Sequence, residues 1–116
     1  MGNLFKSGRS SEIENFVQEQ IKSAHVVMFV KKTCPYCSDA IDILRSQYGP
    51  NFTENDMHVI DIAKRPDHEA IQDYLCKITG ARTVPRIFIG QTSIGGCSDL
   101  DKLKKTGALA ELLQQK

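Results

Sequence analysis

A pair of cysteines separated by two residues follows a short apolar run and opens a helical pattern, and this arrangement constrains the fold most. The apolar run covers residues 26–30, and the cysteines are Cys34 and Cys37. A continuous apolar run of this length is typical of a strand covered on both faces. Pro35 suits the first turn of a helix, because the N–H that proline lacks would have no partner there. A Cys-x-x-Cys pair between a buried strand and a helix indicates a redox site.

Hydrophobic periodicity along the rest of the chain predicts the element order α-β-α-β-α-β-β-α-α. The expected strands are residues 26–30, 58–62, 86–89 and 92–94, and the expected helices start near residues 11, 35, 67, 98 and 109. The β-α-β unit predicts that the first two strands are parallel, and the later hairpin adds an antiparallel pair. The predicted fold class is therefore α/β, a three-layer α/β/α sandwich around a four-stranded mixed sheet.

Capping signals predict where two helices begin. Ser11 with Glu14 forms a possible capping box before the first helix, and Ser98 with Asp101 does the same before the fourth. The second helix is expected to run to about residue 47 or 48, since Gly49-Pro50 follows.

Two further local patterns make predictions about the hairpin and the third helix. Gly90-Gln91 is a two-residue turn with glycine first, which favours a type II′ turn. Ile71, Leu75 and Ile78 recur at helical spacing, so we expect them on one buried face of a helix that ends at Gly80.

The bulk properties are those of one ordinary domain of 116 residues with a net charge of +1. Nucleic-acid binding is not expected, because it needs a strongly basic face. No apolar run reaches the roughly 20 residues of a membrane span, and no signal peptide is evident. We therefore expect a cytoplasmic protein without a membrane partner. Residues 1–10 are expected to be a flexible tail before a domain over residues 11–116. The N-terminus with Gly2 resembles a myristoylation signal, but Lys6 stands where that signal needs Ser or Thr.

The two cysteines of the motif have different expected roles. Cys34 lies where the free N–H groups of the following helix and the charges of Lys31 and Lys32 favour a thiolate. Cys37 lies one turn into the helix, where burial keeps it a thiol. We therefore expect Cys34 to be the nucleophile and Cys37 to resolve mixed disulfides.

Two structural alternatives remain open for the cysteine pair. A zinc site would need two more ligands, and the other candidates, which are scattered, are Cys76, Cys97, His25, His58 and His68. A structural disulfide is the second alternative. Neither fits a reducing compartment and this spacing as well as redox catalysis does.

Three separated motifs resemble those of the dithiol glutaredoxins. They are the active-site segment 31–37, Thr83-Val84-Pro85, and the segment 95–100 with its Gly-Gly-Cys-Ser-Asp-Leu sequence. The similarity extends over about residues 12–113. It implies the thioredoxin fold. It also implies the reduction of protein–glutathione mixed disulfides and protein disulfides, with glutathione as co-substrate and without a metal. Glutathione reductase would support the regeneration of the enzyme indirectly, by keeping glutathione reduced. A monomer is the expected state.

The same resemblance implies a glutathione-binding site, in which Pro85 is cis although the residues alone would allow a trans proline. The implied binding residues are Lys31, Tyr36, Gln72, Thr83, Val84, Pro85, Gly96, Cys97, Ser98 and Asp99. Lys31 and Gln72 would hold the glycine carboxylate, and the segment from Cys97 to Asp99 would receive the γ-glutamyl end. Ser98 and Asp99 could equally be helix caps, and Arg82 and Arg86 could be solvated charges or part of a positive field.

Two other functions compete with this interpretation. Some glutaredoxins share a [2Fe–2S] cluster between two monomers, but relatives that do so generally have a smaller residue where this chain has Pro35. A thioredoxin would resemble Trp-Cys-Gly-Pro-Cys at the site, and this chain has no tryptophan.

Overall fold

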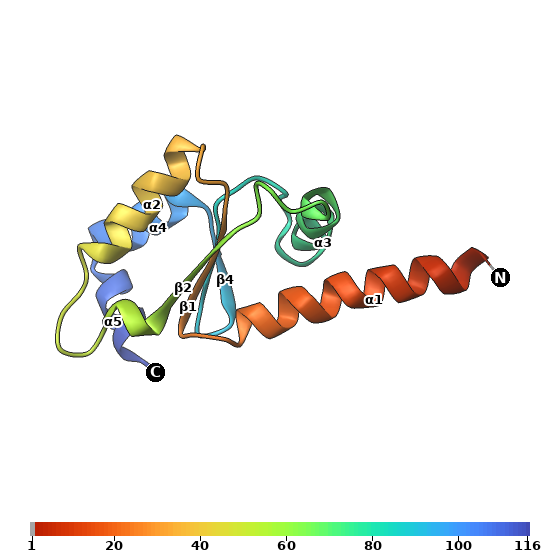
Figure 1. Ribbon diagram of the computed structural model, residues 1–116. Coiled ribbons are helices and arrows are strands. Elements are labelled where there is room, and N and C mark those ends of the chain that lie inside the picture. Colours follow the sequence, from red (N-terminus) through yellow and green to blue (C-terminus); the bar gives the residue numbers. More distant parts are fainter. Residues whose placement is uncertain (1) are drawn as a thin grey trace.

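A four-stranded mixed sheet forms the centre of the molecule, a computed structural model that describes the backbone of residues 2–116 and the side chains of residues 10–116 (Figure 1). The strands are β1 (Val26–Val30), β2 (Met57–Asp61), β3 (Arg86–Ile89) and β4 (Thr92–Gly95), in the spatial order β2-β1-β3-β4. β1 pairs with β2 in parallel, whereas the β1–β3 and β3–β4 pairs are antiparallel. The predicted mixed sheet is confirmed.

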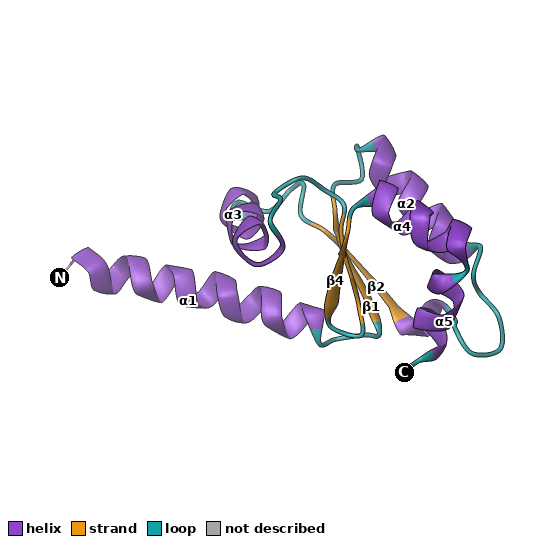
Figure 2. Cartoon of the chain, turned by 180° about the vertical axis from the view of Figure 1, so that it is seen from behind, coloured by secondary structure: helices purple, strands orange, loops and turns teal. Residues whose placement is uncertain are grey.

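Helices cover both faces of this sheet and complete the three layers (Figures 1 and 2). α1 (Gly2–Ile21) and α3 (His68–Thr79) pack on one face. α2 (Pro35–Arg45), α4 (Cys97–Thr106) and α5 (Ala108–Gln114) pack on the other, and a short 3₁₀ turn (Glu54–Asp56) precedes β2. Within the described part of the chain, no helix has both the length and the apolar character needed to cross a membrane.

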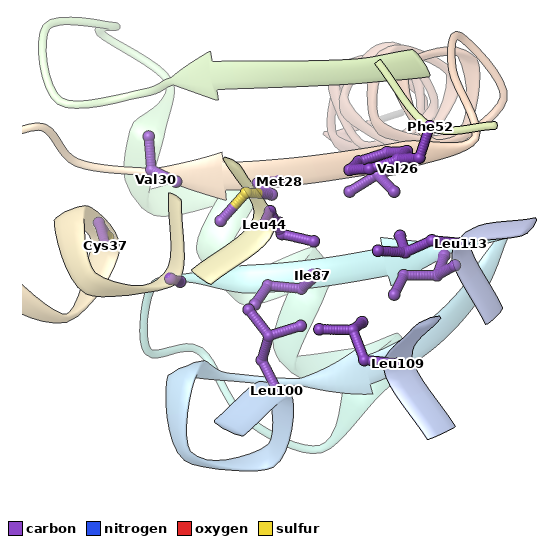
Figure 3. Close-up of a cluster of buried hydrophobic side chains, with 12 residues drawn as sticks. Val26, Met28, Val30, Cys37, Leu44, Phe52, Ile87, Leu100, Leu109 and Leu113 are labelled. Atoms are coloured by element: carbon purple, nitrogen blue, oxygen red, sulfur yellow. The ribbon is translucent and has the colours of Figure 1, made fainter. Parts of the chain in front are cut away.

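β1 is the strand around which both cores form. It lies between β2 and β3, and all five of its residues are fully buried. Successive side chains of a strand point to opposite faces, so Val26, Met28 and Val30 join the cluster under α2, α4 and α5 (Figure 3). Val27 and Phe29 join the cluster under α1 and α3. This explains why the strand is apolar at every position instead of alternating.

Both clusters are filled by large apolar side chains. The first includes Leu44, Ile87, Leu100, Leu109 and Leu113, each exposed by 1% or less (Figure 3). In the second, the rings of Phe29 and Phe88 meet edge to face with centroids 6.0 Å apart. Full burial of each such side chain contributes about 1.5–3 kcal/mol.

The first helix begins earlier than its capping signal predicts. α1 starts at Gly2 and not at Ser11. Because the helix is continuous through Ser11, the amides near it already have helical partners and the capping box has no free N–H to serve. The first turns of α1 extend away from the sheet (Figure 1). The mobility of residues 1–10 and the domain boundary after them stay predictions.

The fourth helix also begins at a different cap. Its N-cap is Gly96, whose N–H donates to the Asp99 carboxylate, so the predicted Ser98–Asp101 cap is wrong. The second helix ends at Arg45, two residues before the earliest predicted end. After Arg45, the N–H groups of Gln47 and Tyr48 donate to the carbonyls three residues earlier, which is the pattern of a 3₁₀ turn and not of an α-helix.

The hairpin turn and one buried face differ from the prediction as well. Gly90 and Gln91 both have positive φ, +57° and +69°, which is the type I′ pattern and not type II′. On α3, Ile71 and Leu75 are fully buried as predicted, but Ile78 is 38% exposed. Helical spacing sets the direction of a side chain around the axis; it does not determine whether another element covers it.

Candidate active site

Cys34 occupies the N-cap of α2, at the junction that the sequence predicts. Its backbone is extended (φ −89°, ψ 120°), its N–H donates to Lys31 O at 2.9 Å, and its side chain is partly exposed. The Cys34 carbonyl accepts the N–H groups of Cys37 and Ser38 at 3.1 and 3.3 Å. The sulfur is therefore held at the positive end of the helix while remaining accessible.

Cys37 is one turn further and only 1% exposed. Burial raises the pKa of the Cys37 thiol to about 12, and the neighbouring Cys34 adds to the rise, while a backbone hydrogen bond with Lys31 lowers it in part. Cys37 is thus a thiol at neutral pH, as the sequence predicts. Only the partly exposed sulfur of Cys34 is placed to meet a substrate first.

The segment Thr83-Val84-Pro85 lies directly beside Cys34. The Val84–Pro85 peptide bond is cis, which confirms the expectation drawn from the resemblance. The Cys34 thiol donates a hydrogen bond to Val84 O, with a sulfur–oxygen distance of 3.8 Å. Two motifs far apart in the sequence therefore meet at one end of the sheet.

A groove of about 430 Å³ runs from this junction to the start of α4. Eight of the ten residues predicted to bind glutathione line it, and so does Arg86. The lining residues are Tyr36, Thr83, Val84, Pro85, Arg86, Gly96, Cys97, Ser98 and Asp99. The sequence prediction did not include Arg86 among the site residues, although a charged residue opening the otherwise apolar strand of residues 86–89 was a usable signal.

Gln72 and Lys31 are the two predicted residues that do not line the groove. Gln72 is 7% exposed, and its Nε2 donates to Arg82 O at 3.0 Å. Its Oε1 lies 3.4 Å from His68 Nδ1. In this arrangement Gln72 anchors the chain just before Thr83, while Lys31 is partly exposed beside the motif.

At the end of the groove, the backbone of Gly95 and Gly96 lies close to Asp99 in the first turn of α4. Gly95 has a φ of +105°, and Gly96 N–H donates to Asp99 Oδ2 at 2.9 Å. Asp99 is therefore a helix cap, which was one of the two roles left open. A Cβ on Gly96 would lie 2.9 Å from Arg86 Nη2, so a larger residue at this position would have to displace the end of the Arg86 side chain.

The remaining cysteines are both partly buried thiols. Burial, with the charges of Asp39 and Asp101, raises the pKa of Cys97. Cys76 lies on α3, away from the groove. Within residues 10–116, no group of three or more His, Cys, Asp or Glu side chains is placed to hold a metal ion.

Comparisons with known proteins agree with this geometry. The sequence model of the family described as Glutaredoxin matches residues 26–94. Glutaredoxin-1 of Mus musculus is 48% identical over 102 residues, covering 88% of this chain and 92% of the relative. Glutaredoxin-1 of Vaccinia virus (strain Copenhagen) is 43% identical over 100 residues, covering 86% and 90%.

Solved structures show the same similarity. Oxidised glutaredoxin 2 from Chlamydomonas reinhardtii superimposes with a TM-score of 0.81 at 34% identity, covering 91% of this chain and 94% of that one. A buckwheat glutaredoxin–glutathione complex gives a TM-score of 0.83 at 29% identity, covering 93% of each chain. The architecture is the thioredoxin fold. With paired cysteines at the expected junction of that fold, the chain belongs to the glutaredoxin family of thiol–disulfide oxidoreductases.

Proposed function

We propose that the protein reduces protein–glutathione mixed disulfides and protein disulfides, with Cys34 as nucleophile and glutathione as electron donor. The observation that carries the proposal is the unequal placement of the two sulfurs. Cys34 is accessible at the helix terminus beside the groove, whereas Cys37 is 1% exposed with its pKa raised to about 12. Such an arrangement separates the attacking thiolate from the reserve thiol.

In the first step, the Cys34 thiolate attacks the glutathione sulfur of the mixed disulfide. The Cys34–glutathione bond forms, the protein–glutathione bond breaks, and the protein leaves as a thiolate. A second glutathione thiolate then attacks the sulfur of the bound glutathione. Oxidised glutathione leaves and the Cys34 thiolate is restored, so the cycle consumes one free glutathione, and the disulfide bond passes from the protein substrate to oxidised glutathione.

Protein disulfides follow a second branch. Cys34 forms a mixed disulfide with the substrate, and Cys37 attacks Cys34 from within the molecule, giving up its proton and releasing the second substrate thiolate. The oxidised Cys34–Cys37 pair is then reduced by two glutathione molecules. In the reduced state described here all four cysteines are free.

The groove suits a peptide thiol with charged ends. The extended segment at Val84 offers backbone groups for strand-like pairing with the cysteinyl unit. The start of α4 offers N–H groups and positive dipole to a carboxylate. The buckwheat relative, solved as a complex with glutathione, supports this choice of ligand. Lys31 and Gln72 bind the glycine carboxylate of glutathione, and Gln72 also anchors the chain before Thr83 through its hydrogen bond to Arg82 O.

The proposal extends to partners and location. The substrates are glutathionylated or disulfide-containing proteins, and glutathione reductase maintains the donor. Four free thiols suit a reducing compartment such as the cytoplasm, and the protein acts as a monomer.

A glutathione-coupled disulfide reductase assay tests the proposal. Wild type is expected to reduce a glutathionylated peptide, and Cys34→Ser to be inactive. Cys76→Ser is the matched control, because it removes a partly buried thiol outside the groove, and it is expected to retain wild-type activity. Activity that survived in Cys34→Ser would refute the nucleophile assignment.

A further inference from the structure

A second groove lies between the edge strand β4 and the helices α4 and α5. Its volume is about 550 Å³, larger than the 430 Å³ of the groove beside Cys34. Thr92 and Ile94 line it from β4, Lys102 and Leu103 from α4, and Leu112 from α5. We call it the edge groove.

The edge groove carries apolar surface that the core leaves partly exposed. Ile94, Leu103 and Leu112 each pack on one side against the cluster under α2, α4 and α5. Each is only partly buried, and each also lines the edge groove. A ligand that covers this surface removes it from water, which is favourable.

Hydrogen bonds hold the far end of the edge groove in place. His25 Nε2 donates to Leu112 O at 2.8 Å, which ties the start of β1 to α5. The Gly90 N–H donates to His25 O at 2.8 Å, which ties the hairpin to the same residue. The groove therefore exists before a ligand binds, and a preformed site costs less entropy on binding.

The edge groove is continuous with the groove beside Cys34, because Asp99 lines both. β4 is an edge strand, and within the described residues it pairs only with β3. An exposed edge strand can pair with an extended peptide. A polypeptide whose cysteine has reached Cys34 can thus continue past Asp99 and along β4.

The charge at the edge groove favours an acidic ligand. Lys102 is exposed, and within residues 10–116 no carboxylate oxygen lies within 4.0 Å of its nitrogen. Lys105 on the same helix differs, because it pairs with Asp101 at 2.9 Å. The carboxylate of Asp99 already accepts the Gly96 N–H. A segment with an acidic residue next to an apolar one would complement this surface.

We propose that the edge groove binds an extended segment of the protein-disulfide substrate, on one side of the substrate cysteine. An apolar side chain of that segment lies against Ile94 and Leu103, and an acidic side chain lies beside Lys102. The inference rests on the proposed function and deepens it. It concerns only the branch in which Cys34 attacks a protein disulfide, since in the other branch Cys34 holds glutathione and the protein leaves. An extended chain advances about 3.3 Å per residue, so the apolar residue is expected about three to six positions from the cysteine.

Reduction of symmetrical peptide disulfides tests the assignment. Each peptide has one cysteine and a Leu-Glu pair placed at a different spacing on either side of it, and a Ser-Gly pair gives the reference. For wild type, kcat/KM is expected to be about threefold to thirtyfold higher with the best Leu-Glu peptide, the gain from burying much of one leucine. The gain is expected on one side of the cysteine only and in KM, because binding along β4 does not change the reacting sulfurs.

Two exposed neighbours on β4 provide a matched pair of variants. Thr92 lines the edge groove, whereas Ser93 does not, because successive strand residues point to opposite sides. Thr92→Trp fills the groove and is expected to abolish the preference for the Leu-Glu peptide. Ser93→Trp is expected to keep that preference. Both variants are expected to reduce the glutathionylated peptide at the wild-type rate.

A second pair of variants tests the charge. Lys102→Glu is expected to favour a Leu-Lys peptide over the Leu-Glu peptide, which reverses the wild-type order. Lys104→Glu is the control, because Lys104 is exposed on the same helix but does not line the edge groove. This pair carries the test if Thr92→Trp does not fold by circular dichroism.

Three results would overturn the assignment. Wild type that showed no preference for a Leu-Glu pair at any spacing would refute docking in the edge groove. An equal loss in Thr92→Trp with the Leu-Glu, Ser-Gly and glutathionylated peptides would place its effect at Cys34 or in the fold. A wild-type dimer in light scattering that Thr92→Trp dissociates would assign the groove to a second copy of this chain. Failure of the proposed function is distinguishable, because wild type would then be inactive on the glutathionylated peptide.

Discussion

The thiol of Cys34 donates a hydrogen bond to the carbonyl oxygen of Val84, 3.8 Å away and 50 positions later in the chain. Strand pairing explains the contact. β1 and β3 are antiparallel neighbours, and Phe29 near the end of β1 faces Arg86 at the start of β3. The residues that follow β1 and those that precede β3 must therefore meet at the same end of the sheet. The nucleophile and the peptide-pairing segment are brought together by this register.

The resolving role of Cys37 predicts a split between two activities. Cys37→Ser is expected to keep most of the activity on a glutathionylated peptide, because that cycle needs only Cys34 and glutathione. Reduction of a protein disulfide is expected to fall by about tenfold or more, because the intramolecular thiol that releases the substrate is lost. Steady-state rates on both substrates measure the split, and equal losses on both would contradict it.

The raised pKa of Cys37 predicts selective alkylation. At pH 8, iodoacetamide is expected to modify Cys34 in the folded protein while Cys37 stays unmodified. The rate at Cys37 should keep rising toward pH 12, where its thiolate forms. Peptide mapping by mass spectrometry at several pH values gives the two profiles; a Cys37 profile with its midpoint near pH 9 would show that burial does not protect the thiol.

The same shift predicts a loss of stability at alkaline pH. The folded pKa of Cys37, about 12, lies above the ordinary value of 9.0, so the contribution is complete below pH 9 and is lost between pH 9 and pH 12. In that window the unfolded thiol ionises first, and the free energy of unfolding falls by up to about 1.4 kcal/mol per pH unit. Under reducing conditions, urea unfolding of wild type is expected to weaken more from pH 8 to pH 10 than that of Cys37→Ala. Parallel pH dependences would contradict the assignment.

The close approach at the start of α4 predicts a strict need for glycine at position 95. Gly95→Ala would place a Cβ in collision with the Asp99 carboxylate, at a φ of +105° that side chains rarely adopt. A loss of about 1–3 kcal/mol in the free energy of unfolding is expected. Gly49→Ala is the control, since nothing lies within 4 Å of its added Cβ. That variant is expected to stay within about 0.5 kcal/mol of wild type; similar values for both variants in urea would argue against the collision.

Two isoleucines of α3 allow a matched test of burial. Ile71 is fully buried and Ile78 is 38% exposed. Ile71→Ala is expected to cost about 2–5 kcal/mol, because it removes packed methyl groups and leaves a cavity. Ile78→Ala is expected to cost less than about 1 kcal/mol, since its side chain is already partly in water. Urea unfolding of both variants measures the difference, and a comparable cost at Ile78 would mean that it is covered in solution.

Local chemistry in the sequence was sufficient for much of the site. The apolar run of β1, Pro35 at the first turn of α2, and the helical position of Cys37 predict which sulfur is exposed and which is buried. These properties depend on the spacing of neighbouring residues, which holds wherever the element lies in the fold. The resemblance to glutaredoxins added the cis bond before Pro85 and most of the residues that line the groove.

Other features depended on contacts between distant segments, and sequence patterns predicted them poorly. In the sequence, Ser98 with Asp101 fits the capping pattern as well as Gly96 with Asp99 does. The structure uses Gly96 and Asp99, because the position at which β4 ends determines where the helix begins. Periodicity gave Ile78 a buried direction, but no element covers it fully. In the sequence, Arg82 and Arg86 are equivalent charges on either side of Thr83-Val84-Pro85. In the structure, Arg86 is buried beside Pro85 and Gly96, whereas Arg82 pairs with Asp73 at the surface. The sequence by itself therefore determined the elements and the chemistry of the cysteine pair, because these follow from local spacing. Only the tertiary structure decided which charge faces the groove, because burial and charge pairing depend on residues that meet only when the sheet has formed.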